Sequence, residues 1–299
     1  MSNFLTLKQK VFLGVIGILF LLNIFVWKEV FILAGPHYLK VDILDIGQGD
    51  AIFIETPDMR HILIDGGPDL AVLGKLAKLL PFFDKSLDVV ILTHPDQDHL
   101  MGLLSVLQKY HVKNILWTGI ARDGGNYQKW LELIEKQKQK GSNIVIADLH
   151  TKIKSGEILI DILNPIENLE GRYFNKTTNE TGIVSRLIYS KKSFLFTADV
   201  SSKTEQQIID LSRQAGSKVN LSSDILKVSH HGSKYSSSEE FLQAVHPSFA
   251  VISVGKDNSY GHPTPEVLQK LQNFGIKILR TDQNGDVEIL SDGENLKIK

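Results

Sequence analysis

Hydrophobic residues follow two patterns along this chain, one before residue 36 and another after it. Beyond Gly35-Pro36, short β-branched runs predict strands, and stretches whose apolar residues recur every three or four positions predict helices. This alternation is typical of a layered domain that combines helices and sheets. The predicted strands are 38–46, 51–56, 61–65, 88–93, 114–119, 143–149, 157–163, 182–189, 193–199, 224–229, 249–254 and 277–281. The predicted helices are 70–83 (ended by Pro81), 99–110, 126–140, 203–215, 238–246 and 263–275, and 166–180 is expected to be a loop.

The pattern before residue 36 is one long apolar run, Val11–Trp27, which contains no charged residue. A helix rises about 1.5 Å per residue, so this run is at the short end of what spans a bilayer. Lys8 and Lys10 precede it, and positive residues favour the cytoplasmic side of a membrane. We therefore predict an uncleaved signal anchor that crosses the cell membrane once. A cleaved signal peptide and a buried helix of a soluble protein are the alternatives.

The anchor divides the chain into two predicted parts. Residues 1–36 form the transmembrane segment, and residues 37–299 form a single domain outside the cytoplasm. That domain is long enough to bury a substantial core, since 42% of the 299 residues are hydrophobic.

Charge and cysteine content limit the chemistry. Lys and Arg total 33 against 34 Asp and Glu, so no global basic excess indicates a nucleic-acid binder, and such a partner would need a local basic patch. The chain has no cysteine, which excludes disulfides and thiolate zinc sites. Any metal must therefore be held by His, Asp, Glu or Asn.

Five predicted strands run into residues that can bind a metal. These residues are Asp65, His94, Asp199, the pair His230-His231, and His262, which follows at a greater distance. Strand ends of one sheet system share an edge, and such edges are where layered folds build their sites. We therefore expect these residues to converge although they are far apart in the sequence.

The segment THPDQDHLMG, residues 93–102, is the densest of these strand ends. His94 and Asp96 are two positions apart and can point inward together, whereas the adjacent Asp98 and His99 face different directions. This spacing suits two metal ions, with His94 and Asp96 on the first and Asp98 and His99 on the second. A solvated polar loop, or an N-cap supplied by Asp98 to the following helix, is the alternative.

Two residues from later strands complete the predicted centre. Asp199 is the best candidate to bridge the two ions, and His230 closes the second site because it comes first off its strand. Two ions roughly 3.5–4 Å apart activate water for attack on a phosphoryl or carbonyl centre. Asp65 either supports a ligand from behind or simply forms a turn, and His262 either contacts the substrate or is structural.

The combined motifs resemble the metallo-β-lactamase fold superfamily, and within it the hydrolase domain of the competence protein ComEC. The resemblance extends over nearly all of the chain beyond residue 40. It implies a four-layer αββα sandwich of the α+β class, preceded here by the transmembrane helix. It also implies the metal ligands His94, Asp96, Asp98, His99, Asp199 and His230, supported by Asp65. The matching segments are LDIGQGDAIFIETP (44–57), LIDGG (63–67), THPDQDHLMGL (93–103), NETGIV (179–184), FLFTADV (194–200), LKVSHHGSKYSSS (226–238), YGHPTPEVL (260–268) and RTDQNGDV (280–287).

The chain departs from the superfamily pattern at the first metal. Many members have His where Asp96 stands, and many have a further His ligand before the bridging Asp. No His occurs between His150 and His230 here, and Asn179 lies near the missing position. An oxygen-rich site makes Mn²⁺ an alternative to Zn²⁺, and a single ion an alternative to two. ComEC also carries a large multi-helix channel, so this chain with one span is not expected to be a DNA channel by itself.

The leading functional hypothesis is a membrane-anchored, metal-dependent hydrolase of phosphodiesters such as DNA, that is, a nuclease. Its membrane partner, if it has one, is not identified by the sequence. Two other hypotheses stay open: hydrolysis of a small lactone, amide or phosphoester at the same site, and a non-catalytic binding module with a degenerate site. The expected catalytic residues are Asp98, Asp65 and His262, and the expected substrate contacts are His231, Ser233, Lys234 and Asn179.

Overall fold

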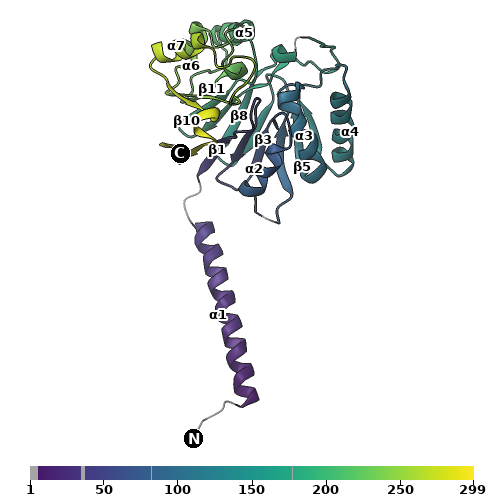
Figure 1. Cartoon of the computed structure of the whole chain (residues 1–299), viewed down its shortest axis with the longest axis vertical. Coiled ribbons are helices and arrows are strands. Elements are labelled where there is room, and N and C mark those ends of the chain that lie inside the picture. Colours follow the sequence, from purple (N-terminus) through teal and green to yellow (C-terminus); the bar gives the residue numbers. More distant parts are fainter. Residues whose placement is uncertain (1–5, 35–37, 82, 177) are drawn as a thin grey trace. The chain divides into compact units, whose positions relative to one another are not determined.

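The computed structural model of the chain describes residues 6–34, 38–81, 83–176 and 178–299 (Figure 1). The chain divides into two compact units, Met1–His37 and Tyr38–Lys299, and each is described by itself. The predicted domain boundary between residues 36 and 37 lies outside the described residues.

In the described part of the first unit, residues 6–34, there is one helix, α1 (Leu7–Ala34). Within it, the 21 residues Leu7–Trp27 are apolar apart from a few positions, and none of their surface is buried by protein. At about 1.5 Å per residue they extend roughly 31 Å, close to the thickness of a bilayer's hydrocarbon core. A helix that is apolar on every side is typical of a membrane span. This helix is long and apolar enough to cross a membrane.

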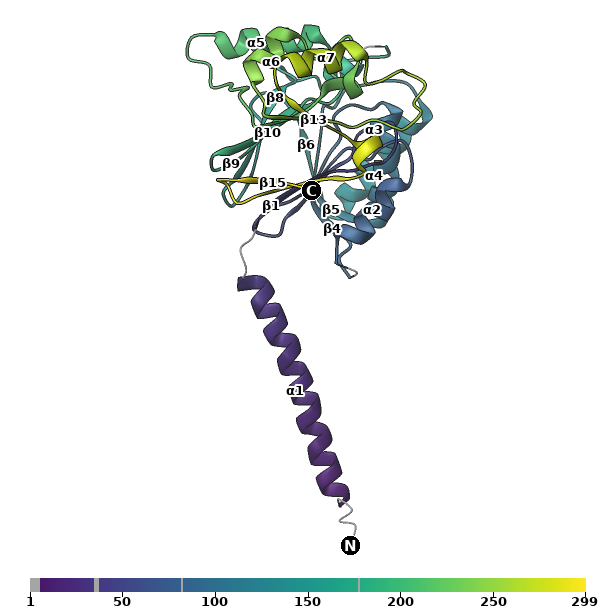
Figure 2. The same cartoon turned by 60° about the vertical axis from the view of Figure 1, so that its left-hand side comes forward.

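The second unit is built on two packed sheets (Figure 2). Within the described residues, the first sheet has eight strands and the second has seven. The first has the order β15 (Leu296–Ile298), β14 (Val287–Ser291), β1 (Leu39–Ile43), β2 (Ile52–Glu55), β3 (His61–Ile64), β4 (Ser86–Ile91), β5 (His111–Trp117) and β6 (Asn143–Ile146). The second has the order β13 (Lys277–Arg280), β12 (Phe249–Ile252), β11 (Ile225–Lys227), β10 (Lys192–Phe196), β9 (Val184–Tyr189), β8 (Ile158–Asn164) and β7 (Lys152–Ser155).

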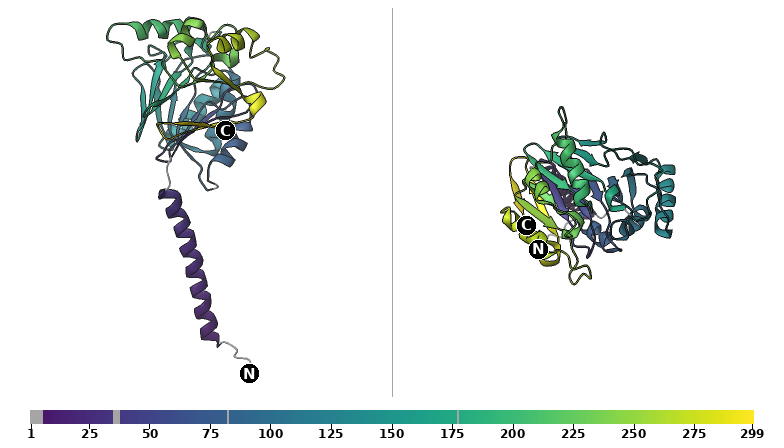
Figure 3. Two further views of the ribbon diagram at one scale, coloured as in Figure 1. Left: turned by 90° about the vertical axis from the view of Figure 1, so that its left-hand side faces the viewer. Right: turned by 90° about the horizontal axis from the view of Figure 1, so that it is seen from above.

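Helices cover the outer face of each sheet, so the unit is the predicted αββα sandwich (Figure 3). The first sheet carries α2 (Ala71–Leu79), α3 (Gln97–Lys109) and α4 (Gly125–Gln139). The second carries α5 (Ser202–Arg213), α6 (Glu239–Val245) and α7 (Pro265–Asn273). Short helices η1 (Thr178–Thr181), η2 (Ser229–Gly232) and α8 (Thr281–Asn284) lie in connecting segments.

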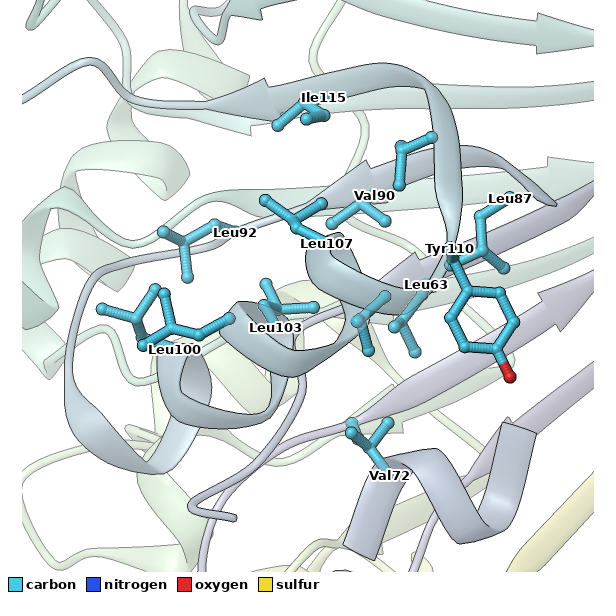
Figure 4. Packing of buried hydrophobic residues seen from close by; sticks show 14 of the residues in the cluster. Leu63, Val72, Leu87, Val90, Leu92, Leu100, Leu103, Leu107, Tyr110 and Ile115 are labelled. Carbon is cyan, nitrogen blue, oxygen red and sulfur yellow. The ribbon is translucent and has the colours of Figure 1, made fainter. Parts of the chain in front are cut away.

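The strands read as continuous apolar runs because both of their faces are buried. In β2, Phe53 packs under the helices, whereas Ile52 and Ile54 pack between the two sheets. In β10 the large side chains lie on the opposite face from that in β2: Phe194 and Phe196 pack between the two sheets. Figure 4 shows the helix side of the first sheet, where side chains of α3 such as Leu103 point toward the strands.

The twelve predicted strands and the six predicted helices all correspond to observed elements, and α2 ends before Pro81 as expected. Three strands were not predicted: β7, β14 and β15. The residues of β7 are alternately exposed and half-buried and two of its four are lysines, so its hydrophobic signal is weak. The segment expected to be a loop, 166–180, runs into the short helix η1.

Strand direction decides where the site lies. The strands β3, β4, β5 and β6 are mutually parallel, and so are β10, β11, β12 and β13. Each parallel set delivers its strand ends to one edge of its sheet, as expected for a layered fold of this kind. Asp65 and His94 follow β3 and β4, whereas Asp199 and the two histidines follow β10 and β11.

Candidate metal centre

Four side chains from three segments form a compact group that could hold a metal ion. They are Asp98, His99, Asp199 and His231, and their ligand atoms all lie within 4.8 Å of one another. His231 Nε2 lies 3.3 Å from Asp98 Oδ2 and 3.4 Å from Asp199 Oδ2. His99 Nε2 lies 3.4 Å from the same Asp199 oxygen. Two imidazoles and two carboxylates thus converge, a donor set that both Zn²⁺ and Mn²⁺ accept.

The first turn of α3 places Asp98 and His99. Asp96 has an extended backbone and precedes the helix, which turns the next residues back toward the sheet edge. The Gly66 amide donates to the His99 carbonyl at 2.9 Å, so the helix start is tied to the turn after β3. This contact requires two glycines, because a Cβ on Gly102 would lie 1.8 Å from the Gly66 carbonyl oxygen.

Three buried imidazole nitrogens point to a bound cation. The Nε2 atoms of His94, His99 and His231 are buried and have no hydrogen-bond partner among the described residues. Burying a polar atom without a partner costs free energy, so such atoms are rare in folded proteins unless they serve a ligand. A metal ion would satisfy these nitrogens, and the residues therefore fit the group that the sequence predicts.

Partners behind the group fix the orientation of both central imidazoles. Asp65 is fully buried and accepts hydrogen bonds from the Thr93 amide (2.8 Å) and hydroxyl (2.6 Å). Its second oxygen lies 2.8 Å from His99 Nδ1, which donates to it. His231 Nδ1 likewise donates to the Ser253 carbonyl at 2.8 Å. With both Nδ1 atoms engaged as donors, each Nε2 is left to face the ion.

A second, looser arrangement surrounds His94 and Asp96. His94 Nε2 lies 3.9 Å from Asp96 Oδ2, and the His94 and His99 rings are 4.1 Å apart. The other Asp96 oxygen accepts from Arg122 Nη1 (2.8 Å) and from the Thr178 hydroxyl (2.6 Å). One Asp96 oxygen is therefore anchored to protein, while the other faces His94.

A buried lysine lies beneath the group. Lys227 is 1% exposed, forms an ion pair with the buried Asp50, and donates to the Ala198 carbonyl at 3.4 Å. Its Nζ also lies 3.9 Å from Asp199 Oδ1, an oxygen with no hydrogen-bond partner in the described chain. Asp199 therefore presents Oδ2 to the histidines and Oδ1 to the lysine.

Proximity of opposite charges controls protonation in the group. Burial by itself lowers the pKa of His231, but Asp199 and Asp98 raise it to about 9. Burial also opposes protonation of His99, and the surrounding carboxylates nevertheless raise its pKa well above the ordinary value. Burial opposes ionisation of Asp199, yet His231 and His99 hold its pKa well below the ordinary value. Without an ion, protonated imidazoles neutralise the carboxylates, so a cation binds in exchange for protons.

The structure places the two adjacent histidines differently from the sequence-based prediction. His231 belongs to the group of four, whereas His230 Nε2 lies 3.8 Å from Asp199 and is half-buried at the mouth of the cavity. Both residues have positive φ, 49° and 54°, so the chain turns tightly after β11 and directs the second side chain inward. The geometry therefore brings His231, and not His230, into the group that could hold an ion.

A cavity of about 160 Å³ opens over the group. Among the described residues that line it, none has an aliphatic side chain. They are Gln48, Asp96, Asp98, Asn179, Asp199, His230, His231, Tyr260 and His262. Two larger hollows, of about 380 and 480 Å³, share no residue with this group, so their size does not make them candidates for the same chemistry.

The remaining predicted substrate contacts divide into two sets. Asn179, on η1, and His262 line the cavity. Ser233 and Lys234 are not among the lining residues: Ser233 is buried, and the Lys234 ammonium lies over the Tyr235 ring at 5.1 Å.

Sequence reasoning missed four residues that support the site: Asp50, Arg122, Thr178 and Lys227. A signal existed for Lys227, because a lysine inside the otherwise apolar strand ILK needs a buried partner. Asp50 ends the segment GQGD, which lies within the motif LDIGQGDAIFIETP but carries no strand-end signal of its own. Nothing in the local pattern distinguishes Arg122 or Thr178 from surface residues.

The chain is similar in sequence to curated bacterial proteins named for competence and recombination. ComE operon protein 3 of Bacillus subtilis is 34% identical over 274 residues, covering 83% of this chain and 32% of that protein. Competence protein ComA of Neisseria gonorrhoeae is 30% identical over 249 residues, with coverage of 83% and 32%. Recombination protein 2 of Haemophilus influenzae is 28% identical over 287 residues, with coverage of 94% and 32%. The chain spans about a third of the length of these relatives.

Solved structures share the fold at low sequence identity. The metallo-β-lactamase fold protein YhfI of Bacillus subtilis aligns with a TM-score of 0.53 at 13% identity, covering 83% of this chain and 98% of that one. CmlA, a diiron β-hydroxylase from Streptomyces venezuelae, aligns with a TM-score of 0.50 at 13% identity, covering 82% and 53%. The family model of the metallo-β-lactamase superfamily matches residues 44–256, which include all four residues of the metal-holding group. The chain therefore belongs to the metallo-β-lactamase superfamily.

Proposed function

We propose that this protein is a membrane-anchored, metal-dependent hydrolase of phosphodiesters, and that its substrate is nucleic acid. The superfamily fold and the His/Asp group make a metal-dependent hydrolase plausible, and the substrate class is the step that we add. The competence and recombination names of its relatives support a role connected with DNA.

One observation carries this choice of substrate: the cavity over the metal group is small, open and lined by polar and aromatic side chains. Pockets for small organic ligands are usually about 300–1,000 Å³ and mostly apolar. A lactone or an amide with an apolar body would have no apolar surface to pack against in this cavity. A phosphate, in contrast, is compact and polar, and it needs only the cationic centre and a few hydrogen-bond donors.

In this proposal, different residues of the centre hold the ions and orient the ligands. Asp98, His99, Asp199 and His231 would hold one ion, and His94 with Asp96 would hold a second. Bound divalent ions supply an activated water and neutralise the charge that develops on the phosphoryl group. Asp65 holds His99 in position through its Nδ1.

Two histidines at the mouth are suited to contact the leaving group. Burial and the neighbouring His230 and His231 lower the pKa of His262, so its ring is largely neutral at pH 7. Burial similarly lowers the pKa of His230, with His231 and Lys227 acting in the same direction. A neutral imidazole has one N–H donor and one acceptor nitrogen, so either ring can hydrogen-bond to the departing oxygen or to a water molecule that protonates it.

The proposed location rests on α1. Its apolar length supports a single membrane span, and Lys8 and Lys10 before it support a cytoplasmic N-terminus. The hydrolase domain would then face the outside of the cell.

The direct test is cleavage of labelled DNA and RNA oligonucleotides by the full-length protein in detergent, with Zn²⁺ or Mn²⁺ added after removal of bound metal. We expect cleavage that EDTA abolishes and that Asp199→Ala greatly reduces, because the substitution removes a ligand of the proposed ion. A folded, metal-loaded protein that cleaves no oligonucleotide with either ion would refute the proposal.

A further inference from the structure

Tyr260 is an exposed aromatic residue at the edge of the metal cavity. It lines the cavity together with the metal group, yet 69% of its surface remains accessible. Its ring lies parallel to that of His262, with centroids 5.9 Å apart and planes inclined by 24°. One aromatic neighbour therefore supports the ring, while most of its surface is open to solvent.

The segment that carries Tyr260 is held by its own side-chain contacts. Asn258 Nδ2 donates to the Gly255 carbonyl (3.0 Å) and to the His262 carbonyl (2.7 Å). The His262 amide donates back to Asn258 Oδ1 at 3.0 Å. Because one side chain ties both ends of the segment together, the tyrosine is presented at a defined position, and little ordering is required when something binds to it.

A succession of rings connects Tyr260 to the metal group. His230 lies 3.8 Å from Asp199 through its Nε2, and the His230 and His262 rings meet edge to face at 5.7 Å. His262 then stacks on Tyr260. The tyrosine is thus two rings removed from the metal residues, which places it beside the site and not inside it.

The size of the cavity determines what reaches Tyr260. A volume of about 160 Å³ is well below that of ordinary small-ligand pockets, so a phosphate fits over the metal group but a whole nucleotide does not. The sugar and base next to the scissile phosphate must lie outside, along the rim that Tyr260 forms.

We propose that Tyr260 is a stacking platform for an unpaired nucleobase next to the scissile phosphate. This inference rests on the function proposed above and narrows its substrate to single-stranded nucleic acid. Every base has a π-face, so stacking on one tyrosine gives affinity with little sequence preference. In a duplex the bases are stacked on one another and are not available to a ring at the rim.

The test compares two strands of equal length with the full-length, metal-loaded protein. One is oligothymidylate, and the other has the same phosphodiester backbone with baseless spacers. For Tyr260→Ala we expect KM on oligothymidylate to rise about tenfold, with kcat nearly unchanged, as stacking energies per base indicate. KM on the baseless strand should not change. Tyr260→Phe, which keeps the ring, should behave as the wild type on both strands.

Tyr38→Ala is the matched control, because Tyr38 is also an exposed tyrosine (44%) but lies at the start of β1 and not in the metal cavity. It should leave both KM values unchanged. If Tyr260→Ala leaves KM on oligothymidylate unchanged, the inference is overturned. The proposed function would still stand in that case, because the protein cleaves the oligonucleotide. An equal loss on both strands, or equally efficient cleavage of duplex DNA, would overturn the inference too. A wild type that cleaves neither strand would overturn the proposed function and this inference together.

Discussion

At the scale of single residues, the metal centre depends as much on the partners of the ligands as on the ligands. Each central imidazole has one nitrogen fixed by protein, His99 by Asp65 and His231 by the Ser253 carbonyl. Such partners set the tautomer and the direction of the free nitrogen.

Metal uptake should release protons. His231 has a pKa of about 9 in the ion-free group, so at pH 7 it is protonated and must lose its proton to bind an ion. Because the pKa is raised, apparent affinity should increase with pH up to about 9, by about tenfold per pH unit for each proton displaced. Calorimetric titration in two non-coordinating buffers with different ionisation enthalpies measures this release. His231→Gln should release fewer protons, and no release at pH 7 would contradict the assignment.

Asp65→Asn should weaken metal binding without removing a ligand. The change disturbs the hydrogen bond to His99 Nδ1, and loss of such outer partners typically costs about 10–100-fold in affinity. Competition with a fluorescent chelator measures the dissociation constant. Asp58→Asn is the control, since Asp58 accepts from Ser155 on an exposed surface. Equal affinities for both variants would mean that Asp65 only forms a turn.

Lys227→Met should destabilise the ion-free protein by up to about 3–5 kcal/mol, because it removes the ion-pair partner of the buried Asp50 and leaves that carboxylate with His231 Nδ1, 3.6 Å away, as its charged neighbour. Urea unfolding in EDTA measures the free energy. Adding Asp50→Asn should recover much of the loss. Lys113→Met, which breaks the more exposed pair with Asp88, should cost less than about 1 kcal/mol. Similar losses for the two lysines would contradict a buried, coupled pair.

The site also shows which placements can be predicted from a sequence. His94, Asp96, Asp98 and His99 come shortly after β4 and Asp199 comes after β10, and both strands are apolar runs that are visible in the sequence. The choice between His230 and His231 depends on two residues with positive φ, a backbone conformation that periodicity does not record. Arg122 and Thr178 approach Asp96 from distant segments, so only tertiary packing identifies them.

At the scale of elements, the start of α3 links the core to the centre. Leu100 and Leu103 pack on the first sheet, while Asp98 and His99 on the same turns converge with Asp199 and His231. The helical spacing of apolar residues in α3 and the apolar runs of β2 to β5 are clear in the sequence, so these elements could be predicted. The strands β7 and β15 were not predicted, because they are short and partly exposed. The strand β14 was missed although its five residues alternate between buried and half-buried positions.

Gly102→Ala should disturb this link. A Cβ would meet the Gly66 carbonyl oxygen, so the helix must shift, at a cost of about 1–3 kcal/mol. We expect a lower midpoint of thermal unfolding together with weaker metal binding. Gly74→Ala is the matched control: it lies in α2 with no atom within 4 Å of the added Cβ, and should stabilise by roughly 0.5–1 kcal/mol. Unchanged stability of Gly102→Ala would show that the helix start is free to move.

At the scale of the whole molecule, the αββα unit and the apolar helix α1 are separate compact units. The fold alone does not choose the reaction, since a β-hydroxylase shares it. The helix α1, in contrast, allows a testable prediction of the side of the membrane on which that reaction occurs.

Membrane topology can be read with single cysteines, because the chain has none of its own. We expect Asn220→Cys to react with a membrane-impermeant maleimide on intact cells. Thr6→Cys should react only after the cells are opened, since Lys8 and Lys10 favour a cytoplasmic N-terminus. The protein without a substitution is the control, because it has no cysteine to label. The opposite labelling pattern would place the domain in the cytoplasm.

The fixed imidazoles also bear on how the protein acquires its ion. Because Asp65 and the Ser253 carbonyl hold His99 and His231 through hydrogen bonds that involve no ion, we expect the domain to fold before it binds metal. Loading is then a separate event, and the intrinsic order of affinities favours zinc over manganese wherever both compete. The ion carried is therefore set by the pool that the folded domain meets first. We expect protein trapped in the cytoplasm and protein that has left it to be isolated with different metals.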